Sequence, residues 1–258
     1  KRIVHVIAIT LLLGFASGQV SGQDWKSDSA WKKAHKNIVR YSLSNALLFG
    51  FDKAVVFGYE RVLSPKRSMS LNLGTASLPK LLRIETDSFT IGKDVKNNGF
   101  NGSLDYRFYL SKENKYMAPR GIYIGPFYSF NRWSRENSWE RKTAGSSQKF
   151  VTTNTDVKLH TLGFELGYQF VLWNRLALDF IMLGPGVGWY NLKAKGEGNL
   201  TEEEREQLQD AVLDLIQQKF PGMNYTLSDE SFDANGTLRT TSLGFRYMIH
   251  IGFSFCPC

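Results

Sequence analysis

The chain has 258 residues, a formal net charge of +8 and a mean hydropathy of −0.27, and its length is enough for one large β-domain. Its two cysteines, Cys256 and Cys258, cannot form a disulfide framework, and two cysteines alone are an incomplete metal site. Aromatic residues nevertheless make up 14% of the chain, beside 23 glycines. This combination is typical of a transmembrane β-barrel, in which lipid-facing apolar residues alternate with polar residues that face the lumen.

The first residues predict a secretory signal peptide. Lys1-Arg2 gives a positive start, residues 3–13 are largely apolar, and small residues follow over 14–18. A membrane anchor is the alternative, but the apolar stretch is shorter than the ~20 residues that a spanning helix needs. We expect residues 1–22 to be a signal peptide, cleaved after residue 18 or 22, and residues 23–36 to be a periplasmic segment.

Residues 37–255 predict an all-β domain, an eight-stranded antiparallel up-and-down barrel that spans a membrane. Its strands are expected where apolar residues alternate with small or polar ones. In chain order they are 38–48, 54–63, 68–74, 100–110, 121–130, 160–170, 175–190 and 239–255. The seventh is interrupted by Gly184-Pro185-Gly186, where we expect a bulge or bend. Residues 256–258 form a C-terminal tail.

The hairpin between the sixth and seventh strands tests the register. A turn of three residues at 172–174 would place Phe170 opposite Leu176 and Tyr168 opposite Leu178. Every apolar residue would then lie opposite another apolar residue, and a slip of one residue would destroy this match.

The lengths of the connections predict a topology. Short turns fall at 64–67, 111–120 and 172–174, whereas longer segments fall at 75–99, 131–155 and 191–238. Outer-membrane barrels have short periplasmic turns and long external loops. We therefore expect the three long segments outside the cell and both termini in the periplasm.

The last long segment predicts one helix. Thr201 and Glu204 have the spacing of a capping box, and Pro221-Gly222 ends the pattern. The residues that share one face at helical spacing are Leu208, Ala211, Val212, Leu215 and Lys219. We expect a helix packed on the rim of the barrel; a partner-binding helix is the alternative.

Three short motifs resemble those of uncharacterised small outer-membrane β-barrel proteins. They are AVVFGYERVLSPKRSMSLNLG at Ala54–Gly74, LGPGVGWY at Leu183–Tyr190, and the alternation that ends in Phe253-Ser-Phe255. The resemblance implies an eight-stranded barrel of the OmpA/OmpX type, and a closing strand that the barrel-assembly machinery reads. In that family an aromatic residue is usually the last, whereas Cys256-Pro257-Cys258 follows here. The family brings no established activity.

The polar faces of the expected strands gather charge inside the barrel. These lumen residues are Arg40, Glu60, Asp105, Arg107, Glu165, Asp179 and Arg246. Eight strands leave room for little more than side chains, and buried charges must be paired and hydrogen-bonded. We interpret the set as an ion-pair network that plugs the lumen. A proton or ion path is the alternative.

An enzymatic function would need a site, and the sequence offers little. The histidines after the signal peptide are His35, His160 and His250. His160 is expected near the external end of its strand, on the lipid-facing side. The sequence contains no metal-ligand spacing, phosphate-binding loop or nucleophile elbow. We expect no catalytic residue, no metal and no cofactor.

The favoured hypothesis is a non-enzymatic barrel in a bacterial outer membrane, with a structural or surface-interaction role through long external loops. The alternatives are a lipid-modifying enzyme with His160 near its site, and a narrow pore. Expected partners are membrane lipid, the barrel-assembly machinery during insertion, and a partner at the external loops; nucleic acid is not expected. A soluble barrel would expose the polar faces, whose many Gly and Ser residues and few Lys make a poor water-facing surface.

Overall fold

A computed structural model describes residues 35–77, 89–110, 114, 116–141, 150–197, 201–203, 206–207, 209–210 and 236–255. The signal peptide, most of the segment 23–36, most of the helix expected after Thr201, and the tail 256–258 lie outside these residues. In the expected helix, the backbone is helical at the described positions 202–203, 206–207 and 209–210. Within the described ranges, no helix is long and apolar enough to cross a membrane.

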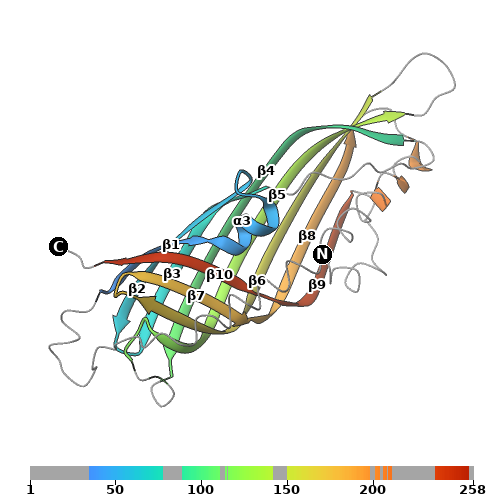
Figure 1. The fold of residues 1–258 in the computed structure, drawn as a ribbon. Helices are drawn as coiled ribbons and strands as arrows, with labels where there is room; N and C mark the ends of the chain where they lie inside the picture. Colours follow the sequence, from blue (N-terminus) through green and yellow to red (C-terminus); the bar gives the residue numbers. More distant parts are fainter. Residues whose placement is uncertain are drawn as a thin grey trace, which may run out of the picture.

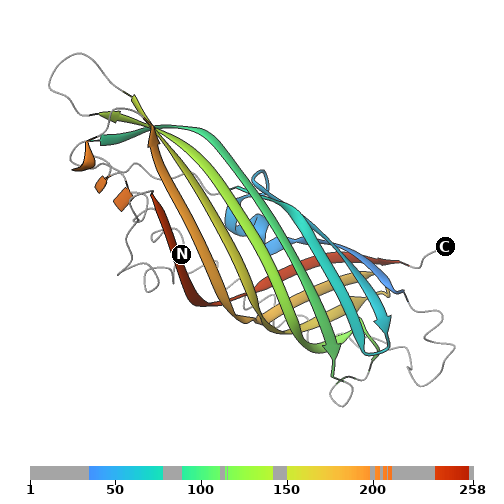
Figure 2. The ribbon, with the colours of Figure 1, turned by 180° about the vertical axis from the view of Figure 1, so that it is seen from behind.

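The described chain is a closed antiparallel barrel (Figures 1 and 2), which confirms the expected fold class. Its strands are β1 (Asn37–Ser42), β2 (Ala54–Ser64), β3 (Arg67–Ala76), β4 (Phe89–Tyr109), β5 (Gly121–Arg141), β6 (Phe150–Leu172), β7 (Leu176–Leu183), β8 (Pro185–Glu197), β9 (Thr237–Phe245) and β10 (Met248–Phe255). Neighbours in sequence pair around the barrel, and β1 closes it by pairing with β10. The successive strands β7 and β8 both pair with β6. On its other edge β7 pairs with β10, and β8 pairs with β9. β7 and β8 together therefore occupy one of eight positions around the barrel, and β9 and β10 together occupy another.

The apolar faces of the strands point outward and the polar faces point into the lumen. Phe164 and Phe57 on the outer face are 69% and 56% exposed, whereas Glu165 and Glu60 on the inner face are 1% and 0% exposed. This arrangement is the reverse of a soluble barrel, whose apolar side chains fill the interior. The alternation in the sequence therefore assigns the two faces correctly.

The first expected strand, 38–48, is wrong in its second half. β1 ends at Ser42, and residues Leu43–Phe49 form the helix α3. Consecutive residues Asn45 and Ala46 are buried while Leu47 and Leu48 are exposed, a grouping that belongs to helical periodicity rather than to alternation. Gly50 ends the helix with a φ of 101°, a conformation that a residue without a side chain adopts easily.

The long segments expected as loops are in part continuations of the strands. β4 begins at Phe89, β5 runs to Arg141, β6 begins at Phe150 and β8 runs to Glu197. Twenty-one residues in β5 are about twice the 9–11 that cross a bilayer. The polar composition of these segments suggested loops, but the residues that the structure describes there belong to strands.

The turn between β6 and β7 lies one residue later than expected, at 173–175, and the predicted register is wrong by two residues. Trp173 and Asn174 have φ values of 48° and 57°, and the N–H of Arg175 donates to the carbonyl of Leu172 at 3.0 Å. The chain reverses around Trp173 and Asn174, which are both left-handed, a conformation that suits a hairpin. Phe170 lies opposite Leu178 and Tyr168 opposite Phe180; a shift of two residues leaves every side chain on its expected face.

Two kinks meet on one side of the barrel. The bend expected at Gly184-Pro185-Gly186 separates β7 from β8, and a second bend at 246–247 separates β9 from β10. The N–H of Arg246 donates to the carbonyl of Gly184 at 2.8 Å, so the bends support each other. Beyond them β9 continues beside β8, but β1 has ended, and no second strand pairs with β9 among the described residues (Figure 1).

Close approach of two strands makes Gly125 a sensitive position. A Cβ at Gly125 would lie 1.8 Å from the backbone oxygen of Tyr106, whereas a Cβ at Gly244 would meet nothing within 4 Å. We expect Gly125→Ala to lower the free energy of unfolding by about 1–3 kcal/mol, because the backbones must separate. Gly244→Ala should change it by less than about 0.5 kcal/mol. Urea unfolding in phospholipid vesicles measures both, and equal effects would contradict the assigned packing.

Candidate functional site

The seven charged residues expected in the lumen lie together in one layer across the barrel. They come from β1, β2, β4, β6 and β7 and from the bend before β10. Arg246 is the most exposed, with 11% of its side chain accessible; the others are 3% exposed or less. Every one of them forms at least one ion pair with another member of the set. We call this set the charge layer.

Arg107 occupies the middle of the charge layer. Its Nη2 lies 2.8 Å from Oδ2 of Asp179, and its Nε lies 3.3 Å from Oε1 of Glu165. Its Nη1 donates to Gln169 Oε1 at 3.0 Å, and the guanidinium lies over the ring of Tyr123, 4.3 Å from the centroid. Charge pairing and stacking on an aromatic face together suit the planar guanidinium.

Arg40 shares Asp179 with Arg107 and also pairs with Asp105. Its Nη1 lies 3.1 Å from Asp179 Oδ2, and its Nη2 lies 3.3 Å from Asp105 Oδ2. Its Nε donates to Asn72 Oδ1 at 2.9 Å and its Nη2 to Ser70 Oγ at 2.6 Å. Asp179 thus bridges Arg40 and Arg107, which stand on strands that are not neighbours.

Arg246 completes the charge layer from above. Its Nη1 lies 2.5 Å from Asp105 Oδ1 and 3.3 Å from Glu165 Oε2. Glu165 and Arg246, the two mid-strand charges on the sixth and last expected strands, therefore meet directly, although Asp105 is the nearer acid. The guanidinium also lies over the ring of Phe127, 4.8 Å from the centroid.

Glu60 is a fully buried acid of the charge layer. It lies 3.6 Å from both Arg40 and Arg107, and it accepts hydrogen bonds from Ser68 Oγ at 2.6 Å and from Tyr109 Oη at 3.2 Å. Neutral donors therefore satisfy one carboxylate oxygen while the guanidinium groups face the other.

Several neutral partners in the layer were not singled out in the sequence. Tyr123 donates to Asp179 Oδ1 at 2.7 Å, and Nδ1 of His250 lies 3.2 Å from Asp179 Oδ2. Their inward positions in the alternation of their strands could have identified them. Residues 121–130, however, are apolar on both faces, so the sequence does not show that Tyr123 has a polar partner. The network needs these groups because four carboxylates face only three guanidinium groups.

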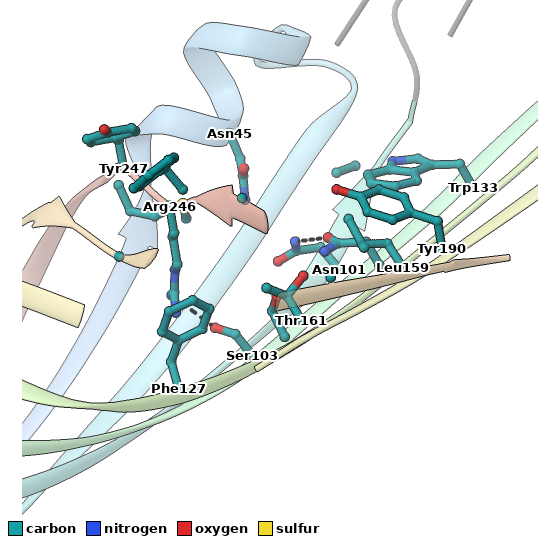
Figure 3. A pocket seen from close by; sticks show the side chains of 18 residues that line it. Asn45, Asn101, Ser103, Phe127, Trp133, Leu159, Thr161, Tyr190, Arg246 and Tyr247 are labelled. Atoms are coloured by element: carbon teal, nitrogen blue, oxygen red, sulfur yellow. Dashed lines mark hydrogen bonds between the residues drawn. The ribbon is translucent and has the colours of Figure 1, made fainter. Parts of the chain in front are cut away.

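A cavity of about 270 Å³ borders the charge layer at Arg246 (Figure 3). Arg246 and Phe127 border it below, and Trp133, Leu159 and Tyr190 border it at the ends of the strands farther from the layer. Apart from Arg246, its polar lining is neutral and includes Asn45, Asn101, Ser103, Ser129, Asn131 and Thr161. The lumen is thus divided into a filled half and a half with space.

His160 does not belong to either half. Its side chain is exposed on the outer face, where Nδ1 lies 2.7 Å from Tyr128 Oη and the ring lies 4.7 Å from that of Phe130. This position fits an aromatic belt at a membrane interface. No group of three metal-ligating side chains occurs in the part of the chain that the structure describes.

Comparisons with known proteins add little to this geometry. No family model and no curated protein matches the chain. A crystal structure of CarO from Acinetobacter baumannii matches 86% of this chain and 97% of its own, with 12% sequence identity and a TM-score of 0.37. A likeness this distant carries no functional argument. The strand pairings themselves define the class, a closed eight-stranded antiparallel barrel with an apolar outside and a charge-filled lumen.

Burial of the charge layer predicts strong coupling between its members. Arg107→Met and Asp179→Asn should each lower the free energy of unfolding by about 3–5 kcal/mol, because each leaves charges unpaired in the lumen. The double variant should lose less than the sum of the two. Unfolding in vesicles measures the cycle.

The pair Arg132–Asp156 is the matched control. Its atoms lie 2.7 Å apart, but the side chains are 52% and 23% exposed, so removing either should cost less than about 1 kcal/mol. Strictly additive losses for Arg107 and Asp179 would show that these two residues do not share a network.

Proposed function

We propose that this chain is a non-enzymatic barrel of a bacterial outer membrane, closed to ions by its charge layer, with a binding role at the end that projects outside. The observation that carries the proposal is the contrast between the two faces of the same strands. An apolar exterior is favoured when lipid surrounds the barrel. Because the members of the charge layer are ion-paired with one another in a narrow lumen, a role in stability is favoured over a role in transport.

An outward band of apolar residues supports the membrane position. On β5 the outward residues Ile122, Ile124, Tyr128 and Phe130 are followed by Arg132 and Ser134. At that change, the rings of Phe100 and Phe130 lie 6.1 Å apart, His160 pairs with Phe130, and Trp189 pairs with His160. A ring of aromatic side chains at a change from apolar to polar marks a membrane interface.

The same boundary separates two parts of the barrel. The charge layer and the short turns lie on one side of it, whereas the polar continuations of β4, β5, β6 and β8 lie on the other. Short periplasmic turns and long external segments are the rule in these barrels. In this proposal the projecting strands, rather than flexible loops alone, present the surface to a partner outside the cell.

The alternatives have less support. A narrow pore would need a path through side chains that are buried and mutually paired. A lipid-modifying enzyme at His160 would need further catalytic groups on the outer face, where the described contacts of His160 are with Tyr128 and Phe130.

Planar-bilayer recording tests the closed lumen. Purified protein should insert without producing stable conductance steps, because the charge layer fills the space between the strands. A porin inserted under the same conditions is the positive control. Discrete, reproducible steps from this protein would reject the plug and favour the pore.

Cysteine labelling of intact cells tests the orientation. In a background with Cys256→Ser and Cys258→Ser, an impermeant maleimide should label Ser134→Cys. This residue lies on the exposed outer face of β5, beyond the row of aromatic side chains at Phe130. Lys66→Cys, in the exposed turn between β2 and β3, should be labelled only after the outer membrane is permeabilised. The opposite pattern would reverse the orientation, and equal labelling of both in intact cells would reject the membrane position.

A further inference from the structure

A band of basic side chains follows a row of aromatic ones on the outer surface of the barrel. The aromatic row consists of residues that lie opposite one another on β5, β6 and β8: Phe130, His160 and Trp189. Two residues farther along the strands, the next outward row continues onto β9 and contains Arg132, Lys158, Asn191 and Arg239. One row beyond it, Lys193 lies opposite Asp156. Basic residues from four neighbouring strands therefore gather on one outer face (Figure 1).

The two faces of the strands exchange character at the aromatic row. On the side of the charge layer, Phe164 is outward and 69% exposed while Glu165 is inward and buried. On the other side, Val157 and Leu192 are inward and buried, while Lys193 is outward and exposed. Residues two apart on a strand share a face, so the same alternation now places apolar residues inside. The outer surface therefore changes at this row from one that suits lipid tails to one that suits water.

The side chains of Lys158, Lys193 and Arg239 form one basic cluster. Asn191 lies between Lys158 and Arg239 in the register, and Lys193 is two residues farther along the strand of Asn191. Lys193 is therefore a diagonal neighbour of both other cations, and diagonal neighbours lie about 7–8 Å apart, within reach of long side chains. The three charged ends can thus converge on a single anion in front of Asn191.

Asp156, the acid that lies opposite Lys193, is already paired. Arg132 donates to its Oδ2 from both Nε and Nη2, at 2.9 and 2.7 Å. This pair cancels its own charge and leaves the positive charge of the basic cluster in place. Lys193 and Arg239 are exposed and Lys158 is half-buried. Neighbouring like charges destabilise a sheet, so an anion bound between them is stabilising.

The basic cluster lies at the depth of lipid headgroups. Aromatic residues mark the interface of the hydrocarbon core, and outward rows are about 7 Å apart along a strand. That spacing is about 5 Å along the membrane normal for strands tilted by ~40°, and the headgroup layer is about 5–8 Å thick on each side. Lys158 and Arg239 therefore stand in this layer, and the flexible side chain of Lys193 can reach back to it.

We propose that Lys158, Lys193 and Arg239 bind the phosphate group of an anionic membrane lipid on the outer surface of β6, β8 and β9. The inference rests on the proposed membrane position, which supplies the lipid and sets its depth. Arginine contacts two phosphate oxygens at once, whereas each lysine supplies a point charge. Leu162 and Leu243, on the other side of the aromatic row, are 53% and 80% exposed and provide an apolar surface for the acyl chains of the same lipid.

Lysine reactivity in lipid nanodiscs tests the inference, because nanodiscs expose both membrane surfaces. The protein is reconstituted in phosphatidylcholine with increasing fractions of phosphatidic acid, and the acetylation rate of each lysine is read by mass spectrometry. A bound phosphate covers an amine and keeps it protonated, so phosphatidic acid should slow Lys158 and Lys193 about fivefold or more. Lys195, two residues beyond Lys193, and Lys66, in the exposed turn at the opposite end, should change little.

Two arginine variants separate the basic cluster from the general charge of the membrane. Arg239→Gln removes the third cation of the cluster and leaves both measured lysines in place. The fraction of phosphatidic acid that gives half of the protection should then rise about fivefold, the effect of one cation near an anionic surface. Arg175→Gln, the matched control, removes an exposed arginine at the opposite end of the barrel and should leave this fraction unchanged. The heat-dependent shift in gel mobility confirms that both variants are folded.

Each other result is decisive. Equal slowing of all these lysines, or no slowing of any, overturns the basic cluster as a site and leaves the membrane position standing. Equal protection by inorganic phosphate in discs of phosphatidylcholine alone overturns a lipid as the ligand. Protection that is unchanged in Arg239→Gln overturns binding by the three residues together. A protein that does not enter the discs overturns the membrane position and this inference with it.

Discussion

Pairing of buried charge is the constraint on which this barrel depends. Seven charged side chains lie inside eight strands, where water cannot solvate them, so each must find partners of opposite charge and further hydrogen bonds. Asp179 shows how this is done, because Arg40, Arg107, Tyr123 and His250 all converge on it from different strands. Such contacts fix the strands relative to one another. A register slip of one residue would turn these charges to the apolar outer face.

The charge layer also explains where the barrel can be irregular. Below and at the layer every strand has two paired neighbours, and the ion pairs cross the lumen. Above it, α3 replaces the end of β1, β9 leaves β10 at the bend, and a cavity opens.

The sequence predicted the faces of the strands better than their lengths or partners. A period of two survives any shift by two residues, so the inward position of Glu165 and Asp179 was secure even though the turn at Trp173-Asn174 was misjudged. Alternation hid α3, since Leu43 and Leu47 share the parity of Val39 and Tyr41, although Asn45 between them breaks the pattern. It could not reveal that polar segments beyond Phe130 remain strands, because polarity marks contact with water and does not distinguish a loop from a hairpin in water.

The candidate site shows the same limit. The sequence predicted the charged residues of the lumen, because they fall on the polar faces of alternating strands. The cavity was not, since it depends on a bend at Gly184, a bend at Arg246 and a helix at Asn45 that meet in space but lie far apart in the chain. Arg246 belongs to both regions: it pairs with Asp105 below and stacks on Phe127 at the cavity floor. The residue that completes the charge layer therefore also forms the base of the space above it, so the geometry of the cavity is set by the same ion pairs that hold the barrel closed.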